Sequence, residues 1–351
     1  MNCHMPETTY MVVDPRRDHS LRIPRPDLAA LLGTPDACSQ CHAAQGPEWA
    51  AAQIRRHHPN PGKGFQDFAA TFAAAELGQP AALQELAQRI GDLSQPALVR
   101  ASSAARLGTR ADQRHWPALV QGLHDSEPDV RLASASGLAG APPAQRGEWL
   151  AHLLVDPLRA VRIEAARLLA DVRLSPAQTP IQASALAEYE ASLRLHADRA
   201  ESRVAMAALR QSQGRMVEAR NELERALLQD PLNVQSYLNL ADLMRAQGED
   251  AQAAQLLRQG ITRLPQTPLL HYALGLNLVR QGLLQDARAH LLTAYQLAPQ
   301  DARIAYAHAL GLWPQQAEAA LDVVQAAIGV NPYDVRLRNA AASMAPRASP
   351  P

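Results

Sequence analysis

The thiol and imidazole side chains of this chain are concentrated near its N-terminus. All three cysteines, Cys3, Cys38 and Cys41, lie within the first 41 residues, and 5 of the 12 histidines lie within the first 58. Such side chains are the usual protein ligands of haem iron and zinc, and an odd number of cysteines argues against a simple disulfide framework. We therefore expect the chemistry in the first sixth of the 351 residues and a scaffold in the rest.

Residues 38–42 read Cys-Ser-Gln-Cys-His, the C-x-x-C-H spacing at which c-type haem is attached. Two thiols three positions apart lie one turn apart on a short helical segment, where they can add to the two vinyl groups of haem. His42 can then bind the iron as the proximal ligand. The alternatives are a zinc-binding knuckle and a thioredoxin-like redox pair. A redox pair is expected in a βαβ unit, which the flanking Pro35, Gly46 and Pro47 do not predict.

Cys3 and His4 have the spacing of the second half of another C-x-x-C-H motif. The first cysteine of that motif would fall one position before Met1. The pair is therefore either half of a second haem motif or a chance occurrence. On the first interpretation we expect Met1 to be an internal residue mistaken for a start, or the chain to be the product of a truncated gene.

Residues 3–52 resemble the paired C-x-x-C-H segment of multihaem cytochromes c that are fused to tetratricopeptide repeats. The resemblance implies electron transfer by covalently attached haem c, with His42 and His4 as proximal iron ligands and Cys38, Cys41 and Cys3 as thioether partners. This sequence lacks the first cysteine of the first motif, which leaves at most one thioether to the second haem. The matching stretches are residues 3–6, 16–27, 32–42 and 49–50.

A six-coordinate haem iron needs a distal ligand, for which we choose His19. This histidine lies between the two motifs, in a stretch whose prolines prevent long helices, so that the chain can wrap a porphyrin in extended form. The alternative is an ordinary surface histidine. Arginines of the same stretch can pair with haem propionates, because guanidinium groups match carboxylates; they are Arg16, Arg17, Arg22 and Arg25.

Four other side chains are within reach of a haem in sequence. Met5 and Met11 are rival ligands, and either would raise the redox potential relative to two histidines. His57 and His58 lie at the expected end of a helix. A helix C-terminus stabilises positive charge there, which explains these two histidines without a role at the iron.

Residues 65–174 contain a repeat with a period of 31. Each repeat has a Val-Arg pair, followed by an alanine five positions and a leucine eight positions after the valine, which places the apolar residues near one helix face. A proline precedes each pair and indicates a helix boundary. The repeat resembles HEAT-like helical pairs, and the recurrent arginine favours a structural contact between repeats. The series are Val99, Val130 and Val161; Arg100, Arg131 and Arg162; Ala104, Ala135 and Ala166; and Leu107, Leu138 and Leu169.

Residues 181–342 contain a second repeat with a period of 34. A mid-repeat glycine and a terminal proline at this period are typical of tetratricopeptide repeats. The glycine allows a tight turn between two helices, the alanine allows close crossing, and the proline ends the second helix. The series are Gly214, Gly248 and Gly282; Ala219, Ala253 and Ala287; Leu223, Leu257 and Leu291; and Pro231, Pro265 and Pro299.

The first helices of such repeats form a concave groove. The mixture of residues expected there suits a peptide or a helix as ligand, or these residues simply cover the surface. The repeats contain no lysine, which argues against a lysine clamp for a C-terminal carboxylate. The expected groove residues are Gln235, Leu238, Asp242, Arg245, Leu269, Tyr272 and Leu276.

Composition excludes several classes. The chain has 34 basic and 34 acidic residues and a net charge of zero, which argues against nucleic-acid binding. Aromatic residues make up 4% and apolar residues 47%, which favours helices that pack through Ala and Leu. No apolar run is long enough to predict a membrane span.

Together these features predict an all-α protein: a short irregular haem-binding segment at 1–58, HEAT-like repeats at 65–174, tetratricopeptide repeats at 181–342 and a disordered tail at 343–351. We expect a c-type cytochrome for electron transfer, with a redox partner protein or a peptide bound to the repeats. The alternatives are a binding module with a vestigial or zinc-binding motif, and a fragment of a multihaem reductase whose catalytic haem lies upstream.

Covalent haem attachment occurs outside the cytoplasmic membrane, so the resemblance implies a periplasmic or exported protein. Residues 1–20 lack the apolar core of a signal peptide. An N-terminal truncation would account for both the missing signal and the incomplete first motif. No catalytic triad, carboxylate pair or phosphate-binding loop stands out, so we expect an electron carrier rather than an enzyme.

Overall fold

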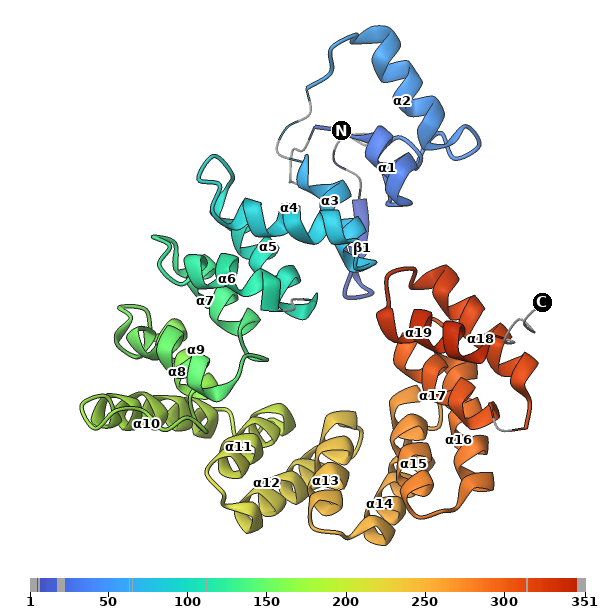
Figure 1. Cartoon of the computed structure of the whole chain (residues 1–351). Helices are drawn as coiled ribbons and strands as arrows, with labels where there is room; N and C mark the ends of the chain where they lie inside the picture. The colour runs from blue at the N-terminus through green and yellow to red at the C-terminus, as the bar shows by residue number, and fades with distance from the viewer. Residues whose placement is uncertain are drawn as a thin grey trace, which may run out of the picture.

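The computed structural model describes residues 5, 7–17, 23–62, 64, 66–110, 113–313 and 315–345. Its helices stack side by side in one curved array that closes most of a ring, and α1 (Pro26–Leu32) and α2 (Gly46–His57) lie beyond the first end of the array (Figure 1). Within the described residues, strands occur only in one short hairpin near the N-terminus. The predicted all-α solenoid is confirmed.

The N-terminal hairpin is absent from the sequence prediction. Strand β1 (Glu7–Tyr10) pairs antiparallel with β2 (Asp14–Arg17), and Glu7 lies opposite Arg17. A pattern of four residues per strand is too short to predict reliably, and Pro15 is tolerated because the ribbon has open edges. Among the described residues before 63, only Pro26, Ala29, Ala50 and Ala51 are buried. This segment therefore has almost no hydrophobic core of its own.

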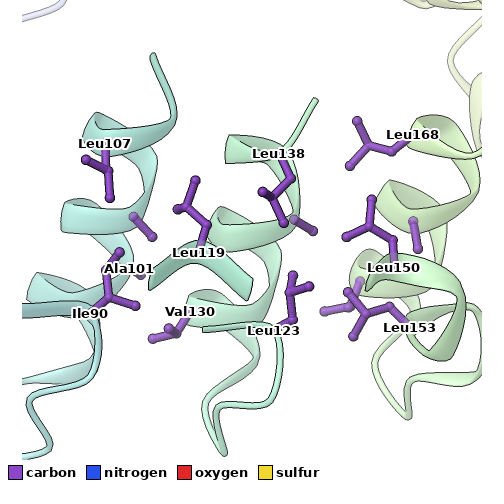
Figure 2. Packing of buried hydrophobic residues seen from close by; sticks show 14 of the residues in the cluster. Ile90, Ala101, Leu107, Leu119, Leu123, Val130, Leu138, Leu150, Leu153 and Leu168 are labelled. Carbon is purple, nitrogen blue, oxygen red and sulfur yellow. The ribbon is translucent and has the colours of Figure 1, made fainter. Parts of the chain in front are cut away.

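The first part of the array is built from short helices whose buried faces follow the period of 31. All nine of the predicted Val, Ala and Leu positions are buried, and six of them are fully enclosed Ala and Leu side chains. Figure 2 shows leucines of successive helices, among them Leu107 and Leu138, pointing into one continuous layer. The elements are α3 (Phe68–Glu76), α4 (Pro80–Ile90), α5 (Ala97–Arg110), η1 (Gln113–His115), α6 (Trp116–Gly122), α7 (Pro128–Gly137), α8 (Pro143–Leu150), η2 (Ala151–Val155) and α9 (Arg159–Leu168).

The recurrent arginines link successive repeats, as predicted. Arg131 binds Asp156 through a salt bridge of 2.7 Å and also donates to the backbone carbonyls of Asp125 and Ser126 at 2.8 and 2.9 Å. Each arginine therefore holds a carboxylate of the next repeat, and Arg131 also closes the loop before its own helix. The ladder consists of Arg100 with Asp125, Arg131 with Asp156, and Arg162 with Glu188.

The second part of the array consists of antiparallel helix pairs with the predicted period of 34. Gly214, Gly248 and Gly282 each end the first helix of a pair in the left-handed region, at φ 75°, 78° and 76°, where a side chain would be strained. The elements are α10 (Thr179–Leu195), α11 (Ala200–Ser212), α12 (Met216–Gln229), α13 (Val234–Ala246), α14 (Asp250–Arg263), α15 (Pro268–Arg280), α16 (Leu284–Leu297), α17 (Ala302–Leu312), α18 (Ala317–Val330) and α19 (Val335–Met344).

One cluster of buried side chains joins the two kinds of repeat. It extends from Phe72 of α3 through Tyr189 of α10 to Leu209 of α11. On the surface of α10, Glu188 binds Arg162 from the preceding helix and Glu190 binds Arg210 from the following one. The division into separate domains stays a prediction. Helix α19 continues to Met344, which is buried, and the predicted tail beyond residue 345 lies outside the described residues.

Candidate functional site

The C-x-x-C-H motif forms a helical turn between α1 and α2. The backbone N–H of Cys41 donates to the carbonyl of Cys38 at 3.2 Å, and that of His42 donates to the same carbonyl at 2.9 Å. These bonds place the two cysteines and the histidine on one turn. Cys41 and His42 are exposed and Cys38 is half-buried. The turn therefore presents two sulfur atoms and an imidazole on a short stretch that is open to solvent.

Asp36 organises this turn from its N-terminal side. Its Oδ1 accepts from the backbone N–H of Cys38 at 2.8 Å and of Ser39 at 3.0 Å, and its Oδ2 accepts from the Ser39 hydroxyl at 2.6 Å. Burial opposes ionisation of Asp36, but the hydrogen bonds from Ser39 and Cys38 outweigh it and hold the pKa below its usual value. The carboxylate therefore remains charged and caps the turn in the manner of an N-cap residue.

Trp49, in the first part of α2, packs against the histidine of the motif. The ring centroids of His42 and Trp49 lie 4.7 Å apart with the planes tilted by 43°. A tilted aromatic contact of this kind restricts the rotation of an exposed imidazole. Across the described residues, no group of three or more His, Cys, Asp or Glu side chains could hold a metal ion.

Three residues of the predicted haem sites, Cys3, His4 and His19, lie outside the described residues, as does Arg22. His57 and His58 lie at the end of α2 opposite the motif turn. At 1.5 Å per residue the helix between them is about 17 Å long, so these two histidines are remote from an iron bound to His42. His57 shares the last turn with Arg55 and Arg56, in agreement with the expected helix-terminal role.

The described arginines of the stretch have carboxylate partners within the chain. Arg16 binds Asp14 at 2.7 Å, Arg25 binds Asp27 at 2.7 Å, and Arg17 lies 3.3 Å from Glu7. In the first two pairs the aspartate lies two positions from its arginine, and this spacing in the sequence could have indicated both salt bridges. Of the rival methionines, Met11 is exposed at the hairpin tip and Met5 is half-buried, with its carbonyl accepting from Arg17. Pairing with propionates stays a prediction.

The predicted groove exists on α13 and α15. A hollow of about 360 Å³ is lined by six of the seven expected residues, among them Leu238, Asp242 and Tyr272. The seventh, Arg245, does not line the hollow but lies 3.1 Å from Asp242. The register of the tetratricopeptide period therefore placed this surface correctly.

A second hollow adjoins the first and was missed by sequence reasoning. It measures about 310 Å³, shares Tyr272 and Leu276 with the first, and is otherwise lined mostly by apolar residues such as Leu284, Tyr306 and Leu310. It lies between α15, α16 and α17. The period is degenerate after residue 300, so no repeat pattern indicated which residues of α17 face the groove.

The two ends of the array face each other (Figure 1), and the residues that line a third hollow come from both of these ends. It has a volume of about 1190 Å³ and lies between α4, α5 and the loops before α17 and α19. Arg110 lines one side, and Tyr333 and Arg336 line the other. Sequence reasoning missed this hollow because it depends on the curvature of the whole array.

The comparisons with known proteins concern the repeats. The tetratricopeptide repeat family model matches residues 210–276, from α11 to α15. None of the curated proteins compared with the chain matches it. Among the helices of the described residues, none is long and apolar enough to cross a membrane.

Several solved structures are similar to parts of the chain. TTC0263, a thermophilic tetratricopeptide protein of Thermus thermophilus, has 20% identity and a TM-score of 0.39, covering 58% of this chain and 98% of its own. YrrB, described as having an unusual peptide-binding site, has 19% identity and a TM-score of 0.35, covering 57% and 98%. MamA has 19% identity and a TM-score of 0.35, covering 39% and 81%. The family match identifies residues 210–276 of this all-α chain as tetratricopeptide repeats, a scaffold for protein–protein interaction.

Proposed function

We propose that this chain is a c-type cytochrome in which haem is attached to Cys38 and Cys41, with His42 as the proximal iron ligand. The observation that supports this best is the hydrogen-bonded turn that places both thiols and the imidazole together on an open surface. Bound haem would supply one-electron redox chemistry. The helical repeats would dock the partner that exchanges electrons with it.

The residues around the turn have positioning roles in this proposal. Asp36 holds the backbone of Cys38 and Ser39, and so fixes the start of the turn that carries the two thiols. Trp49 restricts the ring of His42. The scarcity of buried side chains before residue 63 also suits a prosthetic group, since a porphyrin gives a small segment the apolar core that it lacks.

Three further parts of the proposal concern residues and compartments that the structure does not describe. We place His19 as the distal ligand, and a second haem at Cys3 and His4 with a single thioether. We also place the loaded protein in the periplasm or outside the cell, because haem attachment takes place there. All three depend on the resemblance of residues 3–52 to multihaem cytochromes.

The test of the main proposal is a pyridine haemochrome spectrum of the full chain, expressed with the c-type maturation machinery. We expect Cys38→Ala/Cys41→Ala to lose the haem at residues 38–42, so that at most the single-thioether haem at Cys3 remains, while far-UV circular dichroism of the repeats stays unchanged. The matched control is Cys3→Ala, which should keep the haem at residues 38–42. Colourless mature protein, or stoichiometric zinc in place of haem, would refute the proposal.

The distal ligand is tested separately by His19→Ala. If His19 binds the iron, this variant loses the low-spin visible spectrum while covalent haem is retained. The matched control His57→Ala should leave the spectrum unchanged, because α2 separates His57 from the motif turn. A low-spin spectrum that persists in His19→Ala would reject this assignment.

A second candidate function is a binding module that works through the groove without haem. The two adjoining hollows that share Tyr272 and Leu276 favour it. For a peptide that has been selected for binding to the full chain, this candidate predicts equal affinity for wild type and for Cys38→Ala/Cys41→Ala. It also predicts that Tyr272→Ala lowers the affinity for the peptide. Dependence of binding on the two cysteines would contradict an independent module.

A further inference from the structure

Two histidines of adjacent helices meet inside the third tetratricopeptide repeat. Nδ1 of His271 on α15 lies 3.1 Å from Nδ1 of His290 on α16, and their ring centroids are 5.3 Å apart. His271 is 7% exposed. The pair takes no part in the proposed haem site or in the lining of the groove, so its chemistry needs a separate explanation.

The hydrogen-bond partners determine where the protons of the neutral pair are. Nε2 of His271 lies 3.2 Å from the carbonyl of Pro265, which can only accept, so this nitrogen carries a proton. Nδ1 of neutral His271 is then an acceptor, and Nδ1 of His290 donates to it. The pair is therefore satisfied when both rings are neutral.

At the two positions equivalent to His271 and His290, the preceding repeat has side chains that do not change charge near neutral pH. Tyr237, which is 34 residues before His271, donates its hydroxyl to the carbonyl of Pro231 at 3.1 Å, the counterpart of Pro265. Leu256, the counterpart of His290, packs against the cluster that contains Tyr237. Gly260 leaves room for the tyrosine ring, because a Cβ there would lie 3.1 Å from it.

Few charges act on His290. Burial lowers the pKa of His290, and His271 and Arg258 of α14 lower it further, while Asp286 of α16 raises it. No charged group of α13 or α17 among the described residues contributes to this pKa. Burial, the ring of His271 and Arg258 of the preceding repeat therefore favour the neutral form of His290.

We propose that His271 and His290 form a proton-sensitive joint between α15 and α16, so that acidification loosens the repeat that carries both hollows of the groove. Tyr272 and Leu276 of α15 line both hollows, and Leu284 and Leu291 of α16 line the second. Loosening of these two helices therefore changes the shape of the groove directly.

The number of protons sets the size of the effect. The neutral pair already has one proton between the two Nδ1 atoms, so a first added proton goes to Nε2 of His290 and leaves that hydrogen bond intact. A second proton places two N–H donors against each other inside the repeat. Separated histidines bind both protons, so each pH unit below the ordinary histidine pKa of about 6.5 favours the open repeat by about tenfold.

Hydrogen exchange of the full wild-type chain tests this without any mutation. Between about pH 7.5 and about pH 5.5, after correction for the intrinsic exchange rate, we expect protection of the α15 and α16 amides to fall by about tenfold. Protection of α13 and α14, whose helices have Tyr237 and Leu256 at the joint, should change much less. An equal change in both helix pairs would overturn the proposal.

A transplant from the preceding repeat provides the second test. His271→Tyr/His290→Leu/Ala294→Gly copies the arrangement of Tyr237, Leu256 and Gly260 into the third repeat. We expect this variant to keep the protection of α15 and α16 constant over the same pH interval, although the buried His308 is still present. The matched control His196→Gln, at the exposed end of α10, should behave as wild type. A transplant that folds and still loses protection on acidification would refute the joint.

Discussion

The segment before residue 63 and the helical array after it are stabilised by different means. The array buries nearly every apolar residue that its two periods predict, and its arginine ladder ties one repeat to the next. The N-terminal segment has two short strands, two helices and four buried residues among those described. Its polar contacts are local, as in Asp36 with Ser39 and Arg25 with Asp27.

Because of this difference, the array can be stable by itself, whereas the N-terminal segment is expected to need a bound group for stability. Repeats stack on their neighbours and need nothing else to bury an apolar face. A segment of about 60 residues with so small a core is marginal unless a prosthetic group or metal completes it. Under the proposed function, the segment that binds haem is therefore the one whose stability depends on a bound group, while the array folds by packing repeat on repeat.

The largest contrast is expected from one leucine truncation in each region. Leu107→Ala removes a fully buried side chain of the array and should lower the free energy of unfolding by about 3–4 kcal/mol. Leu31→Ala removes a side chain of α1 that is 68% exposed, and should change the free energy of unfolding by less than about 0.5 kcal/mol. Denaturant unfolding followed by circular dichroism measures both. Equal losses would show that the N-terminal segment has a core of its own.

The arginine ladder gives the next largest effect. Arg131→Ala leaves the buried carboxylate of Asp156 without its partner and removes two bonds to loop carbonyls, so we expect a loss of about 2–3 kcal/mol. Arg225→Ala, at a salt bridge whose arginine is 61% exposed, should be nearly neutral. The same unfolding measurement applies. A neutral Arg131→Ala would mean that helix packing alone holds the repeats together.

Acid should weaken the ladder in a defined direction. Burial opposes ionisation of Asp156, but its bonds to Arg131 and to the backbone N–H of Leu158 hold its pKa below the ordinary value of 3.8. The folded state therefore binds fewer protons than the unfolded state, and the contribution of the pair is lost as the pH falls below about 3.8. The melting temperature of wild type should fall more steeply in this range than that of Arg131→Ala. Parallel curves would contradict the assignment.

The smallest effect concerns the cap of the motif turn. Asp36→Ala removes three hydrogen bonds to residues 38–39 and should destabilise the turn by about 1 kcal/mol. We expect about fivefold slower haem attachment, read as the haemochrome-to-protein ratio at limiting maturation time. Asp14→Ala, at a half-buried aspartate of the hairpin that is remote in sequence from the turn, is the matched control. Unchanged haem attachment in Asp36→Ala would show that the geometry of the turn does not determine the rate of attachment.

Much of the array could be predicted because its determinants are local and repeated. Gly214, Gly248 and Gly282 marked turns that have positive φ, and the groove register placed Leu238 and Tyr272 correctly. The hairpin at residues 7–17 was missed, since four residues per strand carry little periodic signal. At the candidate site the motif turn was predicted, whereas its cap, Asp36, was not. An aspartate two positions before a turn is too common to single out.

The order of residues along the chain is enough to establish the repeat lengths, the helix boundaries and the spacing of Cys38, Cys41 and His42, because each depends on neighbours within one or two turns. Only folding in three dimensions decides that Arg131 meets Asp156, that His271 meets His290, and that the first and last repeats enclose a hollow. Those contacts join residues that are 19 or more positions apart. Their partners are selected by the angle at which helices pack, and no local pattern encodes that angle.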